Sequence, residues 1–507
     1  MPKRLALLIA PLLLASCGGG GSDGGGDGGG DNGGGNPPTS DLPLHFTSAQ
    51  TASVVENQTA AYQATASDPD GKPLTFTIDG GIDADRFSIT PAGTLRFKVA
   101  PDYDLPSDET YNNEYIVRLQ VSNGSESVAQ TVIITVTNSR EGISVERVGT
   151  GFNQPTFLLG IPGSQDMYVL ERTGAVYRLT PSTGAKSLLF TIPDLSTDGG
   201  RGLLGMALLP NPNSNRFMVY CYGAGGDVEL RQYAFAAPGA APTLMATFAI
   251  PHPQPSNRLG GAIAFGPDGL LYVGTGDGRT ADDSRNQAQN PNSQLGKILR
   301  IKVVADPYAG ASAPSTGDFF EPAPGNPYIG GGGDPYVYAL GLRNPASATF
   351  YGSTLTIGDR GQQYFEELNL LTTTQSGANF GWPFKEGSDL LVGRNDPQLP
   401  ADLIDPAFSY FHRTGVGITA GYVYRGPVAS LQGLYILAES PKNRIWSTPA
   451  SGLVPGQRID RISSRDEDFR PDIGSTNAIA GFGEDSSGNL LFVAGRTGEI
   501  FMVRQGT

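Results

Sequence analysis

Two short stretches near opposite ends of the chain decide its fold. Residues 167–177 read MYVLERTGAVY, and residues 491–501 read LFVAGRTGEIF. Each consists of an apolar strand, a turn containing Arg-Thr-Gly and a second apolar strand, so each predicts an antiparallel hairpin. Related apolar strands recur between them, at 217–219, 271–273, 355–357 and 435–437. Such a repeat predicts a closed ring of small sheets in which the first and last units are neighbours.

The composition agrees with an all-β chain. The 507 residues include 70 Gly and 39 Pro, and only 17% are charged, which suits many short strands joined by turns. The repeated strands are spaced to give about six units of roughly 60 residues, which predicts a six-bladed β-propeller over residues 143–505. The net charge of -14 argues against nucleic acid or an anionic membrane surface as partners, because phosphates would be repelled.

The first 17 residues have the pattern of a processing signal. Lys3 and Arg4 precede an apolar run over 5–15 that is too short to span a membrane stably. The sequence Leu-Ala-Ser-Cys at 14–17 resembles the lipobox of bacterial lipoproteins, which implies lipidation of Cys17. A Gly-rich stretch over 18–41 then predicts a flexible tether. We expect an outer-membrane lipoprotein facing the periplasm or the cell surface; an ordinary signal peptide with an incidental Cys is the alternative.

Residues 42–140 predict a separate β-sandwich. Apolar and polar residues alternate over 74–78, 94–97, 115–121 and 131–136, as in half-buried strands. Acidic residues gather in the expected loops, and with them this domain resembles the cadherin repeat, an Ig-like fold. The resemblance implies Ca²⁺ bound by carboxylates, and it implies a glycan or cell-surface protein as partner. The implied ligands are Glu56, Asp68, Asp70, Asp102 and Asp104.

This resemblance has one departure. Asn-Ser-Arg at 138–140 stands where cadherins carry a calcium-binding linker, and no second repeat follows. Acidic residues that are simply solvated in turns are therefore the alternative interpretation.

Residues 143–505 carry six motifs in a fixed order. The motifs are GLLGMA at 202–207, FGPDGLLY at 265–272, LGKILRI at 295–301, ALGLRNP at 339–345, EELN at 366–369 with NFGWP at 379–383, and GYVYRG at 421–426. Together they resemble the glucose/sorbosone dehydrogenase family, whose members include sugar dehydrogenases that use pyrroloquinoline quinone (PQQ). The resemblance implies a calcium- and PQQ-dependent oxidoreductase with a small sugar as substrate.

The resemblance assigns three residues to the cofactor. PQQ is a tricarboxylate, so its pocket needs cations, and Arg can bind a carboxylate through two parallel hydrogen bonds. Arg343 and Asn344 match the family's cofactor-contacting pair, and Lys442 matches a cofactor-contacting Lys by a looser alignment. A salt bridge in a surface loop is the alternative for each charged residue.

The resemblance also implies a catalytic calcium ion. The segment from Asp359 to Glu366 matches a loop in which two backbone carbonyls, here those of Gly361 and Gln362, and the Glu366 carboxylate hold the ion. Because successive residues of a strand face opposite ways, we expect only one of Glu366 and Glu367 to face the site. Three further Asp residues are candidates for a structural calcium site or for turn caps: Asp277, Asp282 and Asp283.

The family's catalytic base is missing at its expected place. There the family has a His, whereas this chain has Arg258, and Arg stays protonated at ordinary pH. His252, six residues upstream, is a second candidate to reach the site, and His412 is a further candidate to border it. Some cofactor-facing positions also differ from the family, at Gly200, Phe380 and 477–479.

Three functions therefore remain open from the sequence. The first is the calcium- and PQQ-dependent sugar oxidoreductase. The second is a catalytically inactive propeller that acts as a calcium-dependent module binding a glycan or a protein, which Arg258 favours. The third is a calcium-dependent hydrolase of the lactonase type, for which no ligand set can be assigned.

Overall fold

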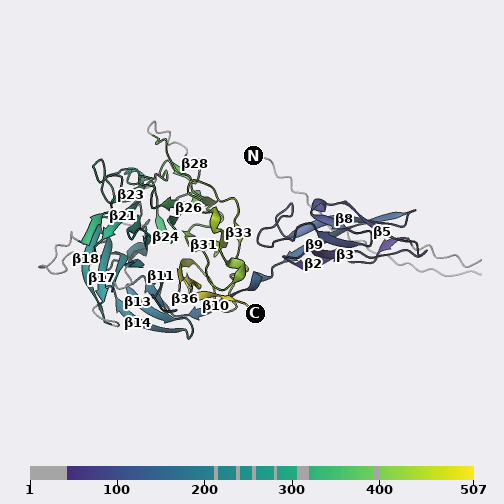
Figure 1. Ribbon diagram of the computed structural model, residues 1–507, viewed down its shortest axis with the longest axis horizontal. Helices are drawn as coiled ribbons and strands as arrows, with labels where there is room; N and C mark the ends of the chain where they lie inside the picture. The colour runs from purple at the N-terminus through teal and green to yellow at the C-terminus, as the bar shows by residue number, and fades with distance from the viewer. Residues whose placement is uncertain are drawn as a thin grey trace, which may run out of the picture.

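We describe a computed structural model, which places residues 43–210, 215–235, 240–253, 258–278, 283–304, 319–391 and 399–506 (Figure 1). The lipobox and Cys17, as well as Asn257 and Asp282, lie outside the described residues. The regular elements within them are strands and short 3-10 turns, so the protein is all-β as predicted. No described helix has the length and apolar character needed to cross a membrane.

The first domain is a β-sandwich of the Ig type. One sheet pairs β2 (Thr51–Val55), β9 (Ser127–Thr137), β8 (Glu114–Ser122) and β5 (Thr75–Gly80), in that order. The facing sheet contains β3 (Ala60–Gln63), β7 (Thr94–Phe97) and β6 (Phe87–Ile89), and β1 (His45–Phe46) pairs with β4 (Ala66–Ser67). A 3-10 turn, η1 (Ala84–Arg86), precedes β6.

Alternation along the strands builds the core of this sandwich. In β8, the side chains of Tyr115, Val117, Leu119 and Val121 are buried while their neighbours are more exposed. The pleat sends successive side chains to opposite faces, so one face meets the other sheet. Tyr115 packs edge-on against Phe97, with ring centroids 5.1 Å apart.

The second domain is a β-propeller whose described strands group into six sheets. The first sheet in chain order contains β11 (Pro155–Gly160), β12 (Met167–Glu171), β13 (Ala175–Thr180) and β14 (Ala185–Thr191). The second contains β15 (Leu203–Leu208), β16 (Arg216–Tyr222), β17 (Val228–Phe235) and β18 (Pro242–Ile250). The third contains β19 (Ile263–Phe265), β20 (Leu271–Thr275), β21 (Lys297–Val303) and β22 (Phe320–Pro322), and β23 (Val337–Leu340) also pairs with β21.

The other three sheets complete the ring. The fourth sheet contains β24 (Pro345–Tyr351), β25 (Thr354–Asp359), β26 (Phe365–Thr372) and β29 (Phe408–Phe411). The fifth contains β30 (Ile418–Thr419), β31 (Leu434–Glu439), β32 (Ile445–Pro449) and β33 (Ser463–Ser464). The sixth contains β34 (Ile479–Glu484), β35 (Leu490–Ala494), β36 (Glu499–Gln505) and β10 (Ile143–Gly149). Smaller elements are β27 (Lys385–Glu386), β28 (Asp389–Leu390), η2 (Arg140–Gly142), η3 (Asp198–Gly200), η6 (Ala429–Leu431) and η7 (Ala450–Gly452).

The ring is closed by the two ends of the domain. Strand β10, which directly follows the first domain, pairs antiparallel with β36, with Ile143 opposite Gln505. The inner strand of this sheet, β34, lies against β11, the inner strand of the first sheet. The two hairpins that open the sequence analysis, β12–β13 and β35–β36, therefore belong to adjacent sheets, as their likeness predicts.

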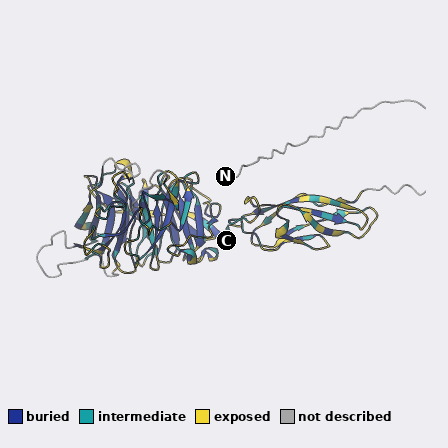
Figure 2. Cartoon of the chain, turned by 90° about the horizontal axis from the view of Figure 1, so that it is seen from above, coloured by how far each residue is buried: buried dark blue, intermediate teal, exposed yellow. Residues whose placement is uncertain are grey.

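Burial explains why the propeller strands do not alternate. All five residues of β20 and of β35 are buried, because neighbouring sheets cover both faces of these middle strands. The outer strand β14 is mostly exposed. Figure 2 shows this contrast, with dark strands inside the ring and a mixed pattern in the thin sandwich beside it. Both views place the sandwich against the rim of the propeller, next to β10 and β33 in Figure 1.

Candidate functional site

A cavity of about 500 Å³ lies on the axis of the propeller. Each of the six sheets or the loop beside it supplies a lining residue, which places the cavity where the inner strands converge. These residues are Thr156, Leu204, Gly261, Ala346, Ser440 and Ile479. A pocket at the convergence of repeated elements is the default site for a ligand in such a fold.

Two guanidinium groups, those of Arg258 and Arg360, line this cavity. No carboxylate or imidazole is among its lining residues in the described part of the chain, and the amide of Asn344 is a further polar lining group. The Nε of Arg360 is buried without a hydrogen-bond partner. The cavity therefore presents positive charge and suits an anionic ligand.

Arg258 is held rigidly at its place in the wall. Its Nη1 donates to Asp277 at 2.9 Å, and its Nη2 donates to the side-chain oxygen of Gln362 at 2.7 Å. Asp277 is fully buried and also accepts a hydrogen bond of 2.9 Å from the indole of Trp382. Arg258 itself has φ of 68°, in the left-handed region that costs a non-glycine residue energy. The partners of Arg258 thus fix its position despite this unfavourable backbone conformation.

Arg343 does not line the cavity but lies behind it. Its Nη1 donates to the carbonyl of Arg360 at 2.7 Å and to that of Gly361, and its guanidinium lies 5.5 Å from the ring of Trp382. Burial lowers the pKa of Arg343, and the nearby charge of Arg258 lowers it further. Its Nε is buried without a hydrogen-bond partner.

The backbone of this motif is fixed by one buried carboxylate. Asp359, at the end of β25, accepts from the N–H of Arg343 at 3.0 Å and from that of Asn344 at 2.6 Å. Burial raises the pKa of Asp359 to about 7. The side chain of Asn344 in turn accepts from the N–H of Gly260 at 2.9 Å, and Asn344 lines the cavity.

The loop after Arg360 is organised by Glu386 of β27. One oxygen of this buried carboxylate accepts from four successive backbone N–H groups, those of residues 362, 363, 364 and 365, at 2.7 to 3.1 Å. Such a nest of N–H groups is a strong anion site, and here the protein's own carboxylate fills it. Sequence reasoning missed Glu386 because no motif marks it.

The two adjacent glutamates of β26 are both turned into the protein. Glu366 accepts from the N–H of Ile418 at 3.1 Å, and the Nε2 of His412 lies 2.8 Å from one of its oxygens. Glu367 accepts from the N–H of Gly387 at 2.6 Å, and burial raises its pKa to about 8. Neither lines the cavity.

Some donor groups of the predicted calcium loop already have partners within the protein. The carbonyl of Gly361 accepts from Arg343, and one oxygen of Glu366 lies 2.8 Å from the Nε2 of His412. The side chain of Gln362, whose backbone carbonyl is the predicted ligand, accepts from Arg258. Calcium requires several free oxygens converging on one point. A guanidinium instead provides the positive charge at this loop.

The remaining candidate residues of the propeller, Lys442, His252 and Asp283, are not among those that line the cavity. Lys442 donates its Nζ to the carbonyl of Arg413. His252 packs edge-on against Tyr222, with centroids 5.3 Å apart, and burial lowers its pKa. Neither lines the cavity. Asp283 accepts from the N–H groups of residues 287 and 288, both at 2.8 Å, so it serves as a turn cap.

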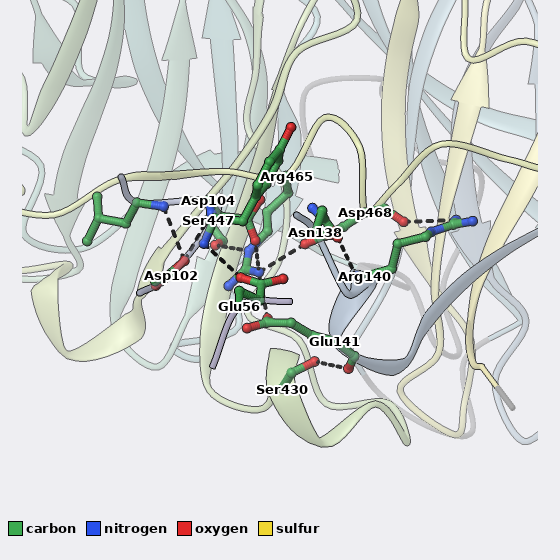
Figure 3. A network of polar contacts seen from close by, with 12 residues as sticks. Glu56, Asp102, Asp104, Asn138, Arg140, Glu141, Ser430, Ser447, Arg465 and Asp468 are labelled. Atoms are coloured by element: carbon green, nitrogen blue, oxygen red, sulfur yellow. Dashed lines mark hydrogen bonds and ion pairs between the residues drawn. The ribbon is translucent and has the colours of Figure 1, made fainter. Parts of the chain in front are cut away.

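The acidic residues of the Ig-like domain separate into two places. Asp68 accepts from Asn123 at 2.8 Å and Asp70 from Lys72 at 3.0 Å, both in exposed turns. Glu56 and Asp104 instead lie at the end facing the propeller, beside Glu141 (Figure 3). Asp102 is also at that end, 3.2 Å from Arg461 of the propeller. The structure thus brings three of the five predicted ligands to one end of the domain, and the carboxylates of two of them, Glu56 and Asp104, into one group with Glu141.

These features define a β-propeller with a cationic cavity on its axis, joined to an Ig-like domain. The chain belongs to the Glucose / Sorbosone dehydrogenase family, whose model matches residues 152–438. Residues 40–137 match the Bacterial Ig domain family.

Known relatives agree with this membership. The chain is 33% identical to HIPL2 protein of Arabidopsis thaliana over 224 residues, which are 41% of this chain and 32% of that protein. It is 27% identical to Hedgehog-interacting protein of Homo sapiens, over 69% of this chain and 50% of that protein. It thus spans about a third of the length of the curated relatives that it matches first, HIPL2 and HIPL1. The structure of the PQQ-bound aldose sugar dehydrogenase from Streptomyces coelicolor matches with 26% identity and a TM-score of 0.53, covering 71% of this chain and 97% of that one.

Proposed function

We propose that the propeller is a PQQ-dependent oxidoreductase of sugars that works at the axial cavity. The observation that carries this proposal is the pair of guanidinium groups, those of Arg258 and Arg360, in the wall of that cavity. Membership of the sugar dehydrogenase family and similarity to a PQQ-bound relative support it.

The residues present fit the charge of PQQ. Arg258 and Arg360 would hold its carboxylates, and the amide of Asn344 would donate to an oxygen of the ring. The orphaned Nε of Arg360 is a buried donor that an anion would satisfy. When bound, PQQ supplies a quinone that accepts the hydride from the carbon bearing the sugar's hydroxyl group. Leu204 and Leu259 help to exclude water from the cavity.

No carboxylate or imidazole that could act as a general base for the proton of that hydroxyl group is among the described lining residues. Arg258 stands at the position of the family's base, and a guanidinium group cannot accept this proton at ordinary pH. Its Nη1 donates to Asp277. A positioned general base contributes about 10²–10⁴-fold to such reactions. We therefore expect slow turnover, limited by loss of this proton to solvent.

A non-catalytic binding module is the second candidate. The fixed ion pair between Arg258 and Asp277 favours it, because it puts a permanent cation where the family has a base. The relative named Hedgehog-interacting protein also supports a role in protein recognition. A glycan or a cell-surface protein would then be the partner.

One set of experiments tests whether the chain binds PQQ, whether it turns over, and which sugar it oxidises. Purified full-length chain is titrated with PQQ while the spectrum of the bound cofactor is recorded, and dye reduction is then measured with a panel of aldoses. Arg360→Met should weaken PQQ binding at least ten-fold. The control Arg425→Met removes an exposed arginine paired with Glu484 and should change nothing. Binding with turnover supports the oxidoreductase; no binding at micromolar PQQ supports the second candidate.

We also propose that the chain is an outer-membrane lipoprotein anchored through Cys17. The lipobox and the Gly-rich tether support this proposal. Cell fractionation of a Cys17→Ser variant tests it. The wild-type chain should be found with the outer membrane and the variant in the soluble fraction; equal distribution of the two would contradict the anchor.

A further inference from the structure

One buried arginine of the propeller reaches into the acidic end of the Ig-like domain. Arg465 follows β33, and its Nη1 lies 2.5 Å from Asp104, 2.6 Å from Glu141 and 2.9 Å from Asp468. Its Nε donates to the hydroxyl group of Ser447 at 3.0 Å. Only 7% of this side chain is exposed. Figure 3 shows the carboxylates converging on it from both domains and from the segment between them.

The acidic group around Arg465 has the spacing of a cation site. Oxygens of Glu56, Asp104 and Glu141 lie within 4.8 Å of one another. Glu56 is also held by the N–H groups of Tyr103 at 2.7 Å and Ser139 at 2.8 Å, so its position is fixed. Packing this much negative charge is unfavourable unless a positive charge compensates it. The Arg465 guanidinium supplies that charge.

Further contacts tie the two domains together at the same place. The N–H of Ser464 donates to the carbonyl of Asp104 at 3.1 Å. Arg461 pairs with Asp102 at 3.2 Å, although this pair is exposed and contributes little. The hydroxyl group of Ser430, in η6, donates to the carbonyl of Glu141 at 2.9 Å. The junction is thus made of backbone and side-chain bonds as well as charge.

The segment between the domains is strained, which indicates a fixed joint. Arg140 and Glu141 are successive non-glycine residues with φ of 54° and 47°. This left-handed region is unfavourable for any residue with a side chain. Such a backbone persists only where its surroundings determine it. Here Arg140 donates to the carbonyl of Asp468 at 3.1 Å, and Glu141 binds Arg465.

We infer that Arg465 is the resident cation of this acidic group and fixes the Ig-like domain to the propeller without calcium. The interaction surface is the acidic end of the Ig-like domain, and its partner is the propeller of the same chain. The carboxylates that predict calcium from the sequence, Glu56, Asp102 and Asp104, are then used for docking. The Ig-like domain is held at one orientation to the ring.

Hydrogen exchange on the full-length chain tests this inference. Peptides covering 102–105 and 463–468 should be equally protected in EDTA and in calcium chloride. Arg465→Met should raise exchange in both peptides at least ten-fold, while a peptide covering β35 stays protected. The matched control is Arg300→Met, since Arg300 is as deeply buried, at 5% exposure, and contacts propeller groups such as Asn326. This control should leave 102–105 unchanged.

Two outcomes would overturn the inference. One is unchanged protection of 102–105 in Arg465→Met; the other is loss of protection when EDTA alone is added, which would assign the joint to an ion. If Arg465→Met does not fold, Glu141→Gln removes one partner without changing shape. It should raise exchange in the same two peptides several-fold, and no change there would equally contradict the role of Arg465.

Discussion

The guanidinium of Arg343 donates to the carbonyl oxygen of Gly361, one of the atoms that the sequence assigns to a calcium ion. The same Nη1 also reaches the carbonyl of Arg360. In the junction between the domains, Arg465 similarly takes the centre of an acidic group. At two separate places a side-chain cation therefore stands where the sequence predicts a metal.

The first prediction concerns calcium at the cavity. PQQ affinity of the wild-type chain should change less than two-fold between EDTA and millimolar calcium, because Arg343 already donates to the loop carbonyls. Arg343→Met should bind PQQ at least ten-fold more weakly in EDTA and regain part of this affinity with calcium. Spectral titration of both proteins is the measurement. A strong dependence of the wild-type chain on calcium would show that the ion displaces Arg343.

The second prediction concerns the missing base. At saturating PQQ, which offsets the loss of one guanidinium group from the cavity, Arg258→His should increase sugar turnover by about 10²-fold or more, because imidazole accepts the hydroxyl proton. His also tolerates the left-handed backbone that residue 258 requires. Dye reduction across pH should show activity rising through the pKa of the new His. Arg258→Gln is the control, since it removes the charge without adding a base; equal gains in both variants would refute the explanation.

The third prediction concerns the loop carrying Arg360. Glu386→Gln should lower the free energy of unfolding of the propeller by about 2 kcal/mol, because charge-assisted hydrogen bonds to four N–H groups weaken. It should also weaken PQQ binding, since the loop positions the cavity wall. Urea unfolding is the measurement, and Asp389→Asn, at an exposed position of β28, is the control. Equal effects of both substitutions would contradict the claim that Glu386 stabilises this loop through the four backbone N–H groups.

The fourth prediction concerns pH at the junction. Burial raises the pKa of Asp104 from its ordinary value of 3.8 to about 9, and the neighbouring carboxylates of Asp468 and Glu56 add to this rise against the opposing effect of Arg465. The folded chain thus keeps a proton on Asp104 that the unfolded chain releases near 3.8, and Arg465 still compensates the carboxylates of Glu141 and Asp468. The contribution of this proton to the free energy of unfolding is complete below pH 3.8 and declines as pH rises towards 9.

The measurement compares wild type with Asp104→Asn. The urea midpoint of the wild-type chain should fall relative to that of the variant between pH 5 and pH 9, because the amide does not titrate. Other buried carboxyls, such as Glu367, contribute equally to both proteins and cancel in the difference. A constant difference across this range would contradict the raised pKa.

The sequence allows the fold to be predicted because each element carries its own signal. The alternation in β8 and the repeated hairpins at β12–β13 and β35–β36 are local patterns, and packing follows from them. The motifs also locate the cavity, since Arg258 and Asn344 line it.

Side-chain directions could not be predicted in the same way. The motif match places Arg343 correctly along the chain, but its direction depends on where the loop at 360–361 passes. Glu386 accepts hydrogen bonds from N–H groups more than twenty residues away. These are backbone groups, which nearly every residue type has, so the sequence does not reveal them. Arg465 and Asp104 are 361 residues apart, and only the docking of two domains brings them together.

The pairing of β10 with β36 has a consequence for biosynthesis. Strand β10 leaves the ribosome before every other strand of the propeller, yet its partner, residues 499–505, is made last. Until then the ring stays open, with bare strand edges that can pair with other chains. Premature termination just before 499 would leave β10 and β35 without a shared partner. Such a shortened product should aggregate rather than accumulate as a slightly smaller propeller.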